Sequence, residues 1–252
     1  MKYRSLAVLG AAFAAAALAG AAQADVTVYD NNFESGSTAG FTGAGGYTPT
    51  IDVAPNGSTK FLGNLSTGQT TAVLTLNTAG LTSVTLNYDL YSILSQDGNA
   101  NGAGGGSGDS FVVTAGGNTI SNFTFANYFG GNTQSFCGSD GSGGYVTGSC
   151  APQTGASAKD TLGYGAPGGG YDDATYDFSY TFTPTGATTV ITFTSNDNEG
   201  VANEFYGIDN VAVTGVRPVT AGGVPEPASW ALMIMGFGGA GALLRRRRLV
   251  AA

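Results

Sequence analysis

The sequence SVTLNYDLYSI, residues 83–93, alternates apolar or aromatic side chains with polar ones along its length. Successive side chains on a β-strand point to opposite faces, so a period of two predicts a strand with one buried and one polar face. The face expected to be buried carries Val84, Leu86, Tyr88, Leu90 and Ser92. A strand of this length can cross a whole sheet, and it sets the expectation that the chain is built from β-strands.

Shorter stretches with the same period lie on both sides of this one. We expect strands at residues 26–29, 60–62, 71–76, 109–114, 119–125, 176–183, 190–194 and 206–213. Segments rich in Gly, Thr, Ser and Asn separate them, and no long helix-periodic stretch lies between them. About nine strands at these intervals predict one all-β domain of two antiparallel sheets packed face to face.

The first residues have the composition of a secretory signal peptide. Two basic residues precede an apolar run at 6–19, and Ala22-Gln23-Ala24 matches an A-x-A cleavage site. We therefore expect a signal helix within a signal peptide of residues 1–24, and a mature chain that begins at Asp25.

The other end of the chain carries a second apolar run. The triplet Pro225-Glu226-Pro227 cannot continue a strand or a helix, because neither proline offers an N–H. The uncharged residues 228–244 follow and contain the only tryptophan, Trp230. The stop-transfer block comes next and consists of Arg245, Arg246, Arg247 and Arg248. An apolar run at the short limit of a bilayer span, closed by arginines, predicts a transmembrane helix whose arginine end is cytoplasmic.

The triplet, Trp230-Ala231, the apolar run and the arginines, in this order, resemble the PEP-CTERM sorting signal in its PEPxxWA variant. The resemblance covers residues 224–248. It implies recognition by an exosortase-type membrane protease and cleavage near the triplet. It also implies transient anchoring in the inner membrane of a Gram-negative bacterium, then transfer to the cell surface or the exterior. An ordinary membrane anchor is the alternative. Residues 215–223 are interpreted as a linker from a sandwich domain at 25–214.

The segment between the two ends is strongly acidic. From Asp25 to Val224, three basic residues against sixteen acidic ones give a net charge of −13. This charge excludes nucleic acid as a partner, whereas cation binding and a plain solvated surface are both compatible with it. The chain has no histidine, which excludes Ser-His-Asp and Cys-His catalysis and histidine-based metal sites. The carboxylate pairs Asp172–Asp173 and Asp197–Glu199 leave a glycosidase as an alternative.

The two cysteines, Cys137 and Cys150, are expected to form a disulfide in an exported protein. Closing a loop of this size stabilises the fold by roughly 3 kcal/mol at most. Both lie in residues 126–174, which hold almost no alternation and are predicted to be a long loop, either functional or disordered. No tryptophan remains once the tail is removed, so any sugar stacking falls to tyrosines, with plain packing as the alternative. The candidate glycan contacts are Tyr128, Tyr145, Tyr164 and Tyr171.

Two short motifs resemble the jelly-roll carbohydrate-binding modules with a galactose-binding-like fold. They are Asn32-Phe33-Glu34-Ser35-Gly36, after the first strand, and Ile208-Asp209-Asn210-Val211-Ala212-Val213, in the last. The resemblance implies a jelly-roll sandwich whose first and last strands run side by side. It also implies a structural calcium ion held by Glu34, Asp209 and backbone oxygens near Asp30. A turn role for Glu34 and strand capping by Asp209 are the alternatives.

These observations describe an exported, exosortase-sorted protein of the cell surface or extracellular matrix. The role we expect is structural or adhesive, associated with exopolysaccharide as in a biofilm, and without catalysis. A lectin-like carbohydrate-binding module is the main alternative, and a secreted glycosidase is the next. Threonine-rich strands such as 71–76 and 188–194 also suggest ice binding, but the chain lacks the fixed short repeat that ice-binding solenoids need.

Overall fold

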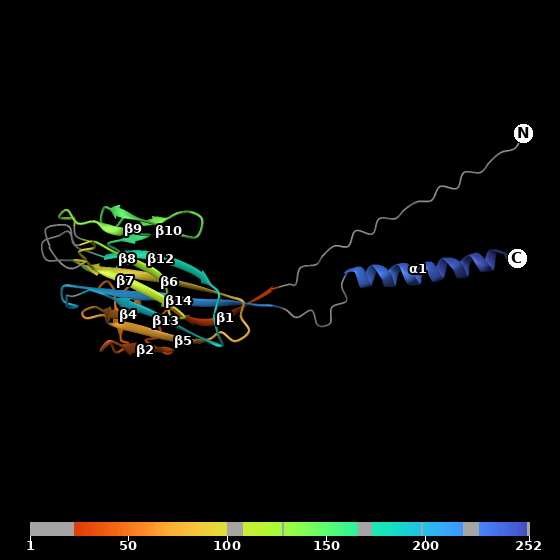
Figure 1. Ribbon diagram of the computed structural model, residues 1–252, viewed down its shortest axis with the longest axis horizontal. Coiled ribbons are helices and arrows are strands. Elements are labelled where there is room, and N and C mark those ends of the chain that lie inside the picture. Colours follow the sequence, from red (N-terminus) through yellow and green to blue (C-terminus); the bar gives the residue numbers. More distant parts are fainter. Residues whose placement is uncertain are drawn as a thin grey trace, which may run out of the picture. The chain divides into compact units, whose positions relative to one another are not determined.

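The computed structural model describes most of the chain. The described stretches are residues 23–99, 108–127, 129–165, 173–197, 199–218 and 227–250. Residues Ala24–Pro218 form one compact unit of β-strands (Figure 1), and the C-terminal helix α1 (Pro227–Val250) is described by itself. The predicted signal helix falls in residues 1–22, outside the described stretches.

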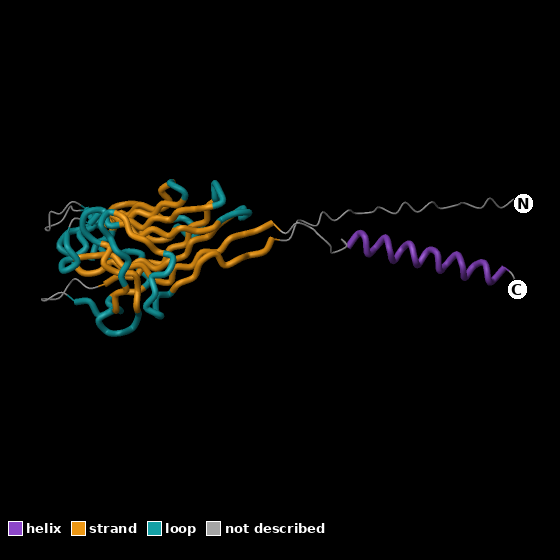
Figure 2. The backbone as a smooth tube through the Cα atoms, turned by 90° about the horizontal axis from the view of Figure 1, so that it is seen from below, coloured by secondary structure: helices purple, strands orange, loops and turns teal. Residues whose placement is uncertain are grey.

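Two large antiparallel sheets form most of this unit, as the alternating pattern predicts, and a separate two-stranded sheet completes it. Sheet I contains, in order, β11 (Ala158–Lys159), β12 (Asp173–Phe182), β6 (Ser83–Leu94), β14 (Glu204–Pro218), β4 (Lys60–Leu65) and β3 (Ile51–Val53), and β1 (Gln23–Asn31) also pairs with β14. Sheet II contains, in order, β2 (Phe41–Ala44), β5 (Thr71–Asn77), β13 (Thr188–Ser195), β7 (Ser110–Ala115) and β8 (Asn118–Thr124). Most strands of the unit lie roughly along one axis, as Figure 2 shows. Because β1 pairs with β14, the first and last strands of the unit lie side by side.

The core between the sheets follows the alternation of β6. Val84, Leu86, Tyr88 and Leu90 are all buried, and so is Ser92. The ring of Tyr88 meets that of Phe193 on β13 edge to face, with ring centroids 5.2 Å apart. Edge-to-face pairs of this kind contribute about 0.5–1.5 kcal/mol beyond the area they bury. The long strand predicted from the sequence is therefore the central link between the two layers.

A second apolar cluster lies on the opposite face of sheet I. Its members are Ala54, Phe61, Tyr91, Ile93, Leu162 and Phe205. The segment that covers it is fixed by the buried carboxylate of Asp173, which accepts N–H bonds from Thr161 at 2.8 Å and Leu162 at 3.0 Å. Asp173 therefore has a structural role here. Its predicted acidic partner, Asp172, lies outside the described residues.

The prediction of a long loop at 126–174 was wrong. The described part of it contains the antiparallel hairpin of β9 (Gln134–Ser139) and β10 (Tyr145–Cys150), together with β11. Alternation is present in β9, but its buried positions are Gln134, Phe136 and Gly138, so hydrophobicity does not reveal it. The described residues hold fourteen strands instead of about nine.

The predicted linker at 215–223 begins later than expected. Strand β14 continues to Pro218, and Gly215 and Val216 pair with Val84 and Ser83 of β6. Backbone pairing to a long neighbour extends the strand even though its own sequence loses the alternating pattern. Residues 219–223 fall outside the described stretches.

The apolar C-terminal run is helical, as predicted, and α1 extends through the arginine block. Among the described residues, no helix combines the length and the apolar character needed to cross a bilayer, so the expected transmembrane helix is not confirmed.

Candidate functional site

Two of the residues predicted to bind calcium, Glu34 and Asp209, meet beside β14. The hydroxyl of Thr59 lies 2.8 Å from Glu34 Oε1 and 2.9 Å from Asp209 Oδ2, so it bridges the two carboxylates. Phe33 holds the turn that carries Glu34. Its side chain is buried, and its backbone N–H donates to Asn31 Oδ1 at 2.8 Å. The structure thus brings together two acidic residues that are far apart in the sequence.

Glu34 and Asp209 differ in their surroundings. Glu34 is exposed, and the N–H of Lys60 at 2.9 Å, followed by the Thr59 hydroxyl, lowers the pKa of its carboxyl. Asp209 is buried, and this burial raises its pKa although it accepts the Tyr91 hydroxyl at 2.8 Å and the Asn210 N–H at 2.7 Å. Each carboxylate therefore has donors from the protein. Asp30 is exposed on β1, and none of the contacts described above involves it.

A row of aspartates crosses the outer face of sheet I. Asp177 of β12 pairs with Asp89 of β6, and Asp89 pairs with Asp209 of β14, so the three side chains share one face. A bulge follows Asp209, where Asn210 has a φ of 50° and its Nδ2 donates to Asp89 Oδ2 at 2.7 Å. Burial raises the pKa of Asp89.

An open hollow of about 500 Å³ lies over this row. Its lining includes the side chains of Asn87, Asp89, Tyr145, Asp177 and Asn210. Carboxylates and amides beside an aromatic ring are the groups with which proteins bind polar ligands of moderate size. The hollow is therefore one place on the sandwich where a polar ligand could bind.

Of the four tyrosines predicted to contact glycan, Tyr145 lines this hollow. Its hydroxyl accepts the N–H of Ser179 at 2.7 Å, and its ring packs on Phe178 with centroids 5.1 Å apart. Tyr164 belongs elsewhere, because it packs edge to face on Phe205 and its hydroxyl donates to Asp52 at 3.3 Å. Tyr128 and Tyr171 lie outside the described residues.

The predicted disulfide is present and supports the same wall of the hollow. Cys137 of β9 is bonded to Cys150 of β10, with Cα atoms 5.7 Å apart. This bond holds the hairpin closed, and the hairpin carries Tyr145.

A buried acidic cluster was missed by the sequence analysis. Single carboxylate oxygens of Asp109, Asp197 and Glu204 all lie within 4.8 Å of one another, and each residue is 1% exposed. Of these only Asp197 had been noted, as half of a pair with Glu199. Each of the three lies at or near a strand end, but no sequence signal links the three positions to one another.

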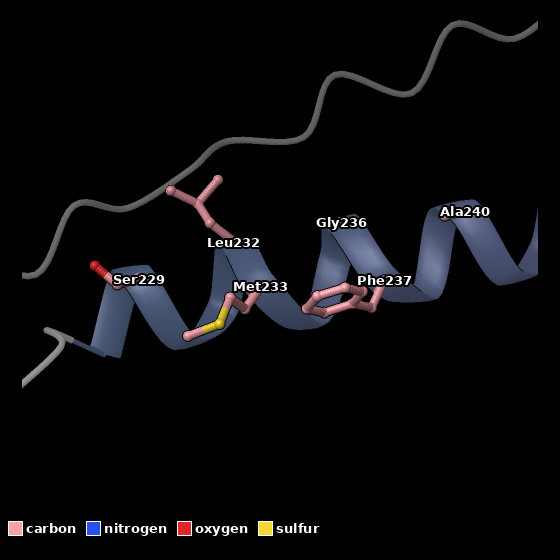
Figure 3. A pocket seen from close by; sticks show the side chains of 6 residues that line it. All are labelled: Ser229, Leu232, Met233, Gly236, Phe237 and Ala240. Carbon is pink, nitrogen blue, oxygen red and sulfur yellow. The ribbon is translucent and has the colours of Figure 1, made fainter.

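The sorting residues are described only from Pro227 onward, so Pro225 and Glu226 lie outside the described residues. Trp230 and Ala231 lie in the first turns of α1. One face of α1 forms a shallow hollow of about 540 Å³ (Figure 3), where side chains flank the bare backbone of Gly236. The residues lining it are Ser229, Leu232, Met233, Gly236, Phe237 and Ala240. Apolar side chains are exposed on other faces as well, including Ile234 and Met235.

Comparison with known proteins identifies this C-terminal segment. A family model described as the PEP-CTERM protein-sorting motif matches residues 223–248. No curated protein sequence matches the chain. The motif expected from the sequence is therefore confirmed.

Several solved structures show a limited likeness to the chain. One is the K3 cleaved adhesin domain of Lys-gingipain from Porphyromonas gingivalis W83, with 17% identity, a TM-score of 0.39, and coverage of 75% of this chain and 99% of that one. Another is the exo-β-1,3-galactanase from Phanerochaete chrysosporium, with 13% identity, a TM-score of 0.31, and coverage of 75% of this chain and 29% of that one. Dimeric latent PorU from Porphyromonas gingivalis has 9% identity and a TM-score of 0.35, with coverage of 82% of this chain and 14% of that one. At these TM-scores the likenesses do not define a fold, and they carry no argument about the function of the chain.

Proposed function

We propose that this chain, which carries a PEP-CTERM sorting motif, is exported and sorted to the cell surface or extracellular matrix by an exosortase-type membrane protease. The single observation that carries the proposal is the family match at residues 223–248. The same motif supports transient anchoring in the inner membrane before cleavage near the triplet.

The proposed role of the sandwich is structural or adhesive, associated with exopolysaccharide and without catalysis. We assign the sandwich to the jelly-roll type, which agrees with the pairing of β1 with β14. The absence of catalysis is supported by the placement of the acidic residues. Glycosidases need two carboxylates that reach a glycosidic bond, whereas Asp173 and Asp197, one from each acidic pair considered for that role, are 0% and 1% exposed.

The sorting proposal is tested by mass spectrometry of the mature protein from its native host, with and without the sorting protease. We expect a C-terminus near residues 225–227 that depends on the protease. An intact tail in both strains would overturn the proposal, since the domain would then remain anchored to the membrane.

A lectin-like module is the second candidate, and the hollow beside Tyr145 is the observation that favours it. The exposed carboxylate of Asp177 borders the hollow, so Asp177→Asn is expected to weaken binding of the host exopolysaccharide. Asp160→Asn is the matched control, because Asp160 is exposed and does not line the hollow. Equal binding by both variants in a titration calorimetry series would exclude this site.

We also propose a structural calcium ion between Glu34 and Asp209. The two carboxylates share one Thr59 hydroxyl, which can donate a proton to only one of them at a time, and calcium accepts such irregular oxygen sets. Calcium is expected to raise the melting temperature of the wild-type chain, and Glu34→Gln should reduce this rise. An identical response in the variant would remove Glu34 from the ligand set.

A further inference from the structure

The buried acidic cluster lies where the two sheets meet at one end of the sandwich. Asp109 directly precedes β7 and Asp197 closely follows β13, and these two strands are neighbours in sheet II. Glu204 is the first residue of β14 in sheet I, at the opposite end of that strand from Pro218. Three chain segments from two layers therefore direct carboxylates to one point.

Several oxygens of this cluster lack a hydrogen-bond donor. Among the described residues, none donates to either carboxylate oxygen of Glu204 or to Asp197 Oδ2. The other oxygen of Asp197 accepts the Glu199 N–H at 2.5 Å, and Asp109 Oδ2 accepts the Asp97 N–H at 2.5 Å. Burying an ionised carboxylate without a partner is strongly unfavourable, so these oxygens indicate a missing positive group.

The charges around the cluster increase the unfavourable energy of ionising these carboxylates. The ionised neighbours that act on the cluster from the described residues are themselves acidic, namely Asp97 and Glu199. Three buried carboxylates this close together cannot all be ionised unless a positive charge or shared protons compensate them.

We infer that Asp109, Asp197 and Glu204 bind a divalent cation, with calcium as the expected ion, that joins sheet I to sheet II at this end of the sandwich. The ligand atoms are all oxygens. Hard cations such as calcium prefer oxygen ligands, whereas many transition metals prefer nitrogen or sulfur ligands. Calcium–oxygen bonds are about 2.4 Å long, so oxygens on opposite sides of one ion lie about 4.8 Å apart. The three carboxylate oxygens all lie within 4.8 Å of one another, close enough to bind one such ion together.

The local backbone also fits a site built around an ion. Asp109 is held from both sides, because its carbonyl accepts the Tyr206 hydroxyl at 2.8 Å while its carboxylate accepts the Asp97 N–H. Gln96, the residue before Asp97, is fully buried, and both polar atoms of its amide lack a partner among the described residues. The rigid placement of Asp109 lowers the ordering needed when an ion binds.

This inference is independent of the sorting proposal and of the Glu34–Asp209 calcium site. The competing explanation is that protons, shared among the three carboxyl groups, replace the cation. A shared proton would let Glu204 donate to Asp109 or Asp197, and a glutamine could then take its place. The two explanations therefore predict opposite results for one substitution.

The test is native mass spectrometry of the full chain with calcium alone as the probe, on the wild type, Glu204→Gln and Glu34→Gln. We expect Glu204→Gln to lose one calcium ion per chain that Glu34→Gln retains, and to lose the thermal stabilisation that goes with it. Asp197→Asn serves as a second variant if Glu204→Gln does not fold. Full calcium content in the folded Glu204→Gln or Asp197→Asn variant would overturn the inference. A wild-type chain without calcium at this site, together with a Glu204→Gln chain that is at least as stable, would establish the shared-proton explanation instead.

Discussion

The two acidic clusters of the sandwich solve the problem of gathered negative charge in different ways. Glu34 and Asp209 receive donors from Thr59, Lys60, Tyr91 and the backbone. In the other cluster, Asp109, Asp197 and Glu204 are all buried. Neither carboxylate oxygen of Glu204 accepts a hydrogen bond from the described residues. The first arrangement can exist without an ion, whereas the second needs one or must take up protons.

This difference separates two uses of a cation. At Glu34 an ion would add to a set of contacts that already holds the turn to the strand. At Glu204 it would be the only compensation for charges on three segments, so the fold at that end should depend on it. The sequence resemblance pointed to the first cluster, Glu34 and Asp209. The uncompensated buried charge points to the second cluster, Asp109, Asp197 and Glu204.

Removing the metal should produce the largest effect. An ion present at about 100 times its Kd stabilises the folded state by about 2.7 kcal/mol. For a domain of this size that corresponds to a rise in Tm of about 5–10 °C. Chelation should lower Tm by this amount and accelerate hydrogen exchange at Phe125, whose N–H donates to the Asp109 carbonyl at 3.3 Å.

Exchange at Lys60, whose N–H donates to Glu34, provides the internal comparison. We expect a smaller acceleration there, because Glu34 is exposed and keeps its protein donors. Greater acceleration at Lys60 than at Phe125 would reverse the assignment of the more ion-dependent cluster.

Much of the framework behind this comparison could be predicted from the sequence. The alternation at 83–93 fixed the buried face of β6, and the motifs around Glu34 and Asp209 placed the first and last strands together. The buried cluster could not be found this way, because Asp109, Asp197 and Glu204 belong to three unrelated local patterns. Their meeting depends on how β13 pairs with β7 and how β14 packs across the sandwich, which no local pattern records.

The hairpin of β9 and β10 escaped prediction for a different reason. Gln134 is fully buried, yet its amide makes several hydrogen bonds, including those to the carbonyls of Phe136 at 2.7 Å and Thr154 at 2.9 Å. A polar residue satisfied in this way occupies a core position without any hydrophobic signal. Glycine at the buried position 138 removes the remaining signal.

A pair of tyrosine substitutions should give the next largest effect. Tyr91→Phe removes a donor 2.8 Å from the carboxylate of Asp209, and such bonds to charged groups contribute about 1.5–3 kcal/mol. Tyr206→Phe removes a donor to the neutral carbonyl of Asp109, which keeps the Phe125 N–H, so we expect about 1 kcal/mol. Denaturant unfolding in chelator measures both, and a larger loss for Tyr206→Phe would contradict the reasoning.

Thr59→Val should have a smaller effect, because the single hydroxyl proton serves two acceptors that keep other donors. We expect a loss of about 1 kcal/mol in chelator. Thr85→Val is the matched control, since Thr85 contacts Thr181 at 2.9 Å in an exposed threonine pair, and exposed changes of this kind stay within about 0.5 kcal/mol. Equal losses for the two variants would show that the bridge at Thr59 does not stabilise the first cluster.

The titration of single carboxyl groups should separate an exposed carboxylate that has protein donors, Asp140, from a member of the buried cluster, Asp109. Asp140 accepts N–H bonds from Ser142 at 2.7 Å and Gly144 at 2.9 Å, which lower its pKa below the usual 3.8. Its contribution to stability is therefore present above pH 3.8 and is lost as the pH falls through its folded-state pKa.

Asp109 should show the opposite sign, because burial raises its pKa to about 6 in the metal-free protein. The folded state then disfavours its ionised form, so stability falls as the pH rises from about 4 to about 6. Side-chain carbon NMR in chelator should show Asp140 titrating below pH 3.8 and Asp109 near pH 6. Calcium should abolish the titration of Asp109 near pH 6 and leave Asp140 unchanged, because an ion bound to Asp109 holds it in the ionised form. If Asp109 titrated alongside Asp140 without calcium, burial would not disfavour the ionised form of Asp109, and the cluster of Asp109, Asp197 and Glu204 would have no need of an ion.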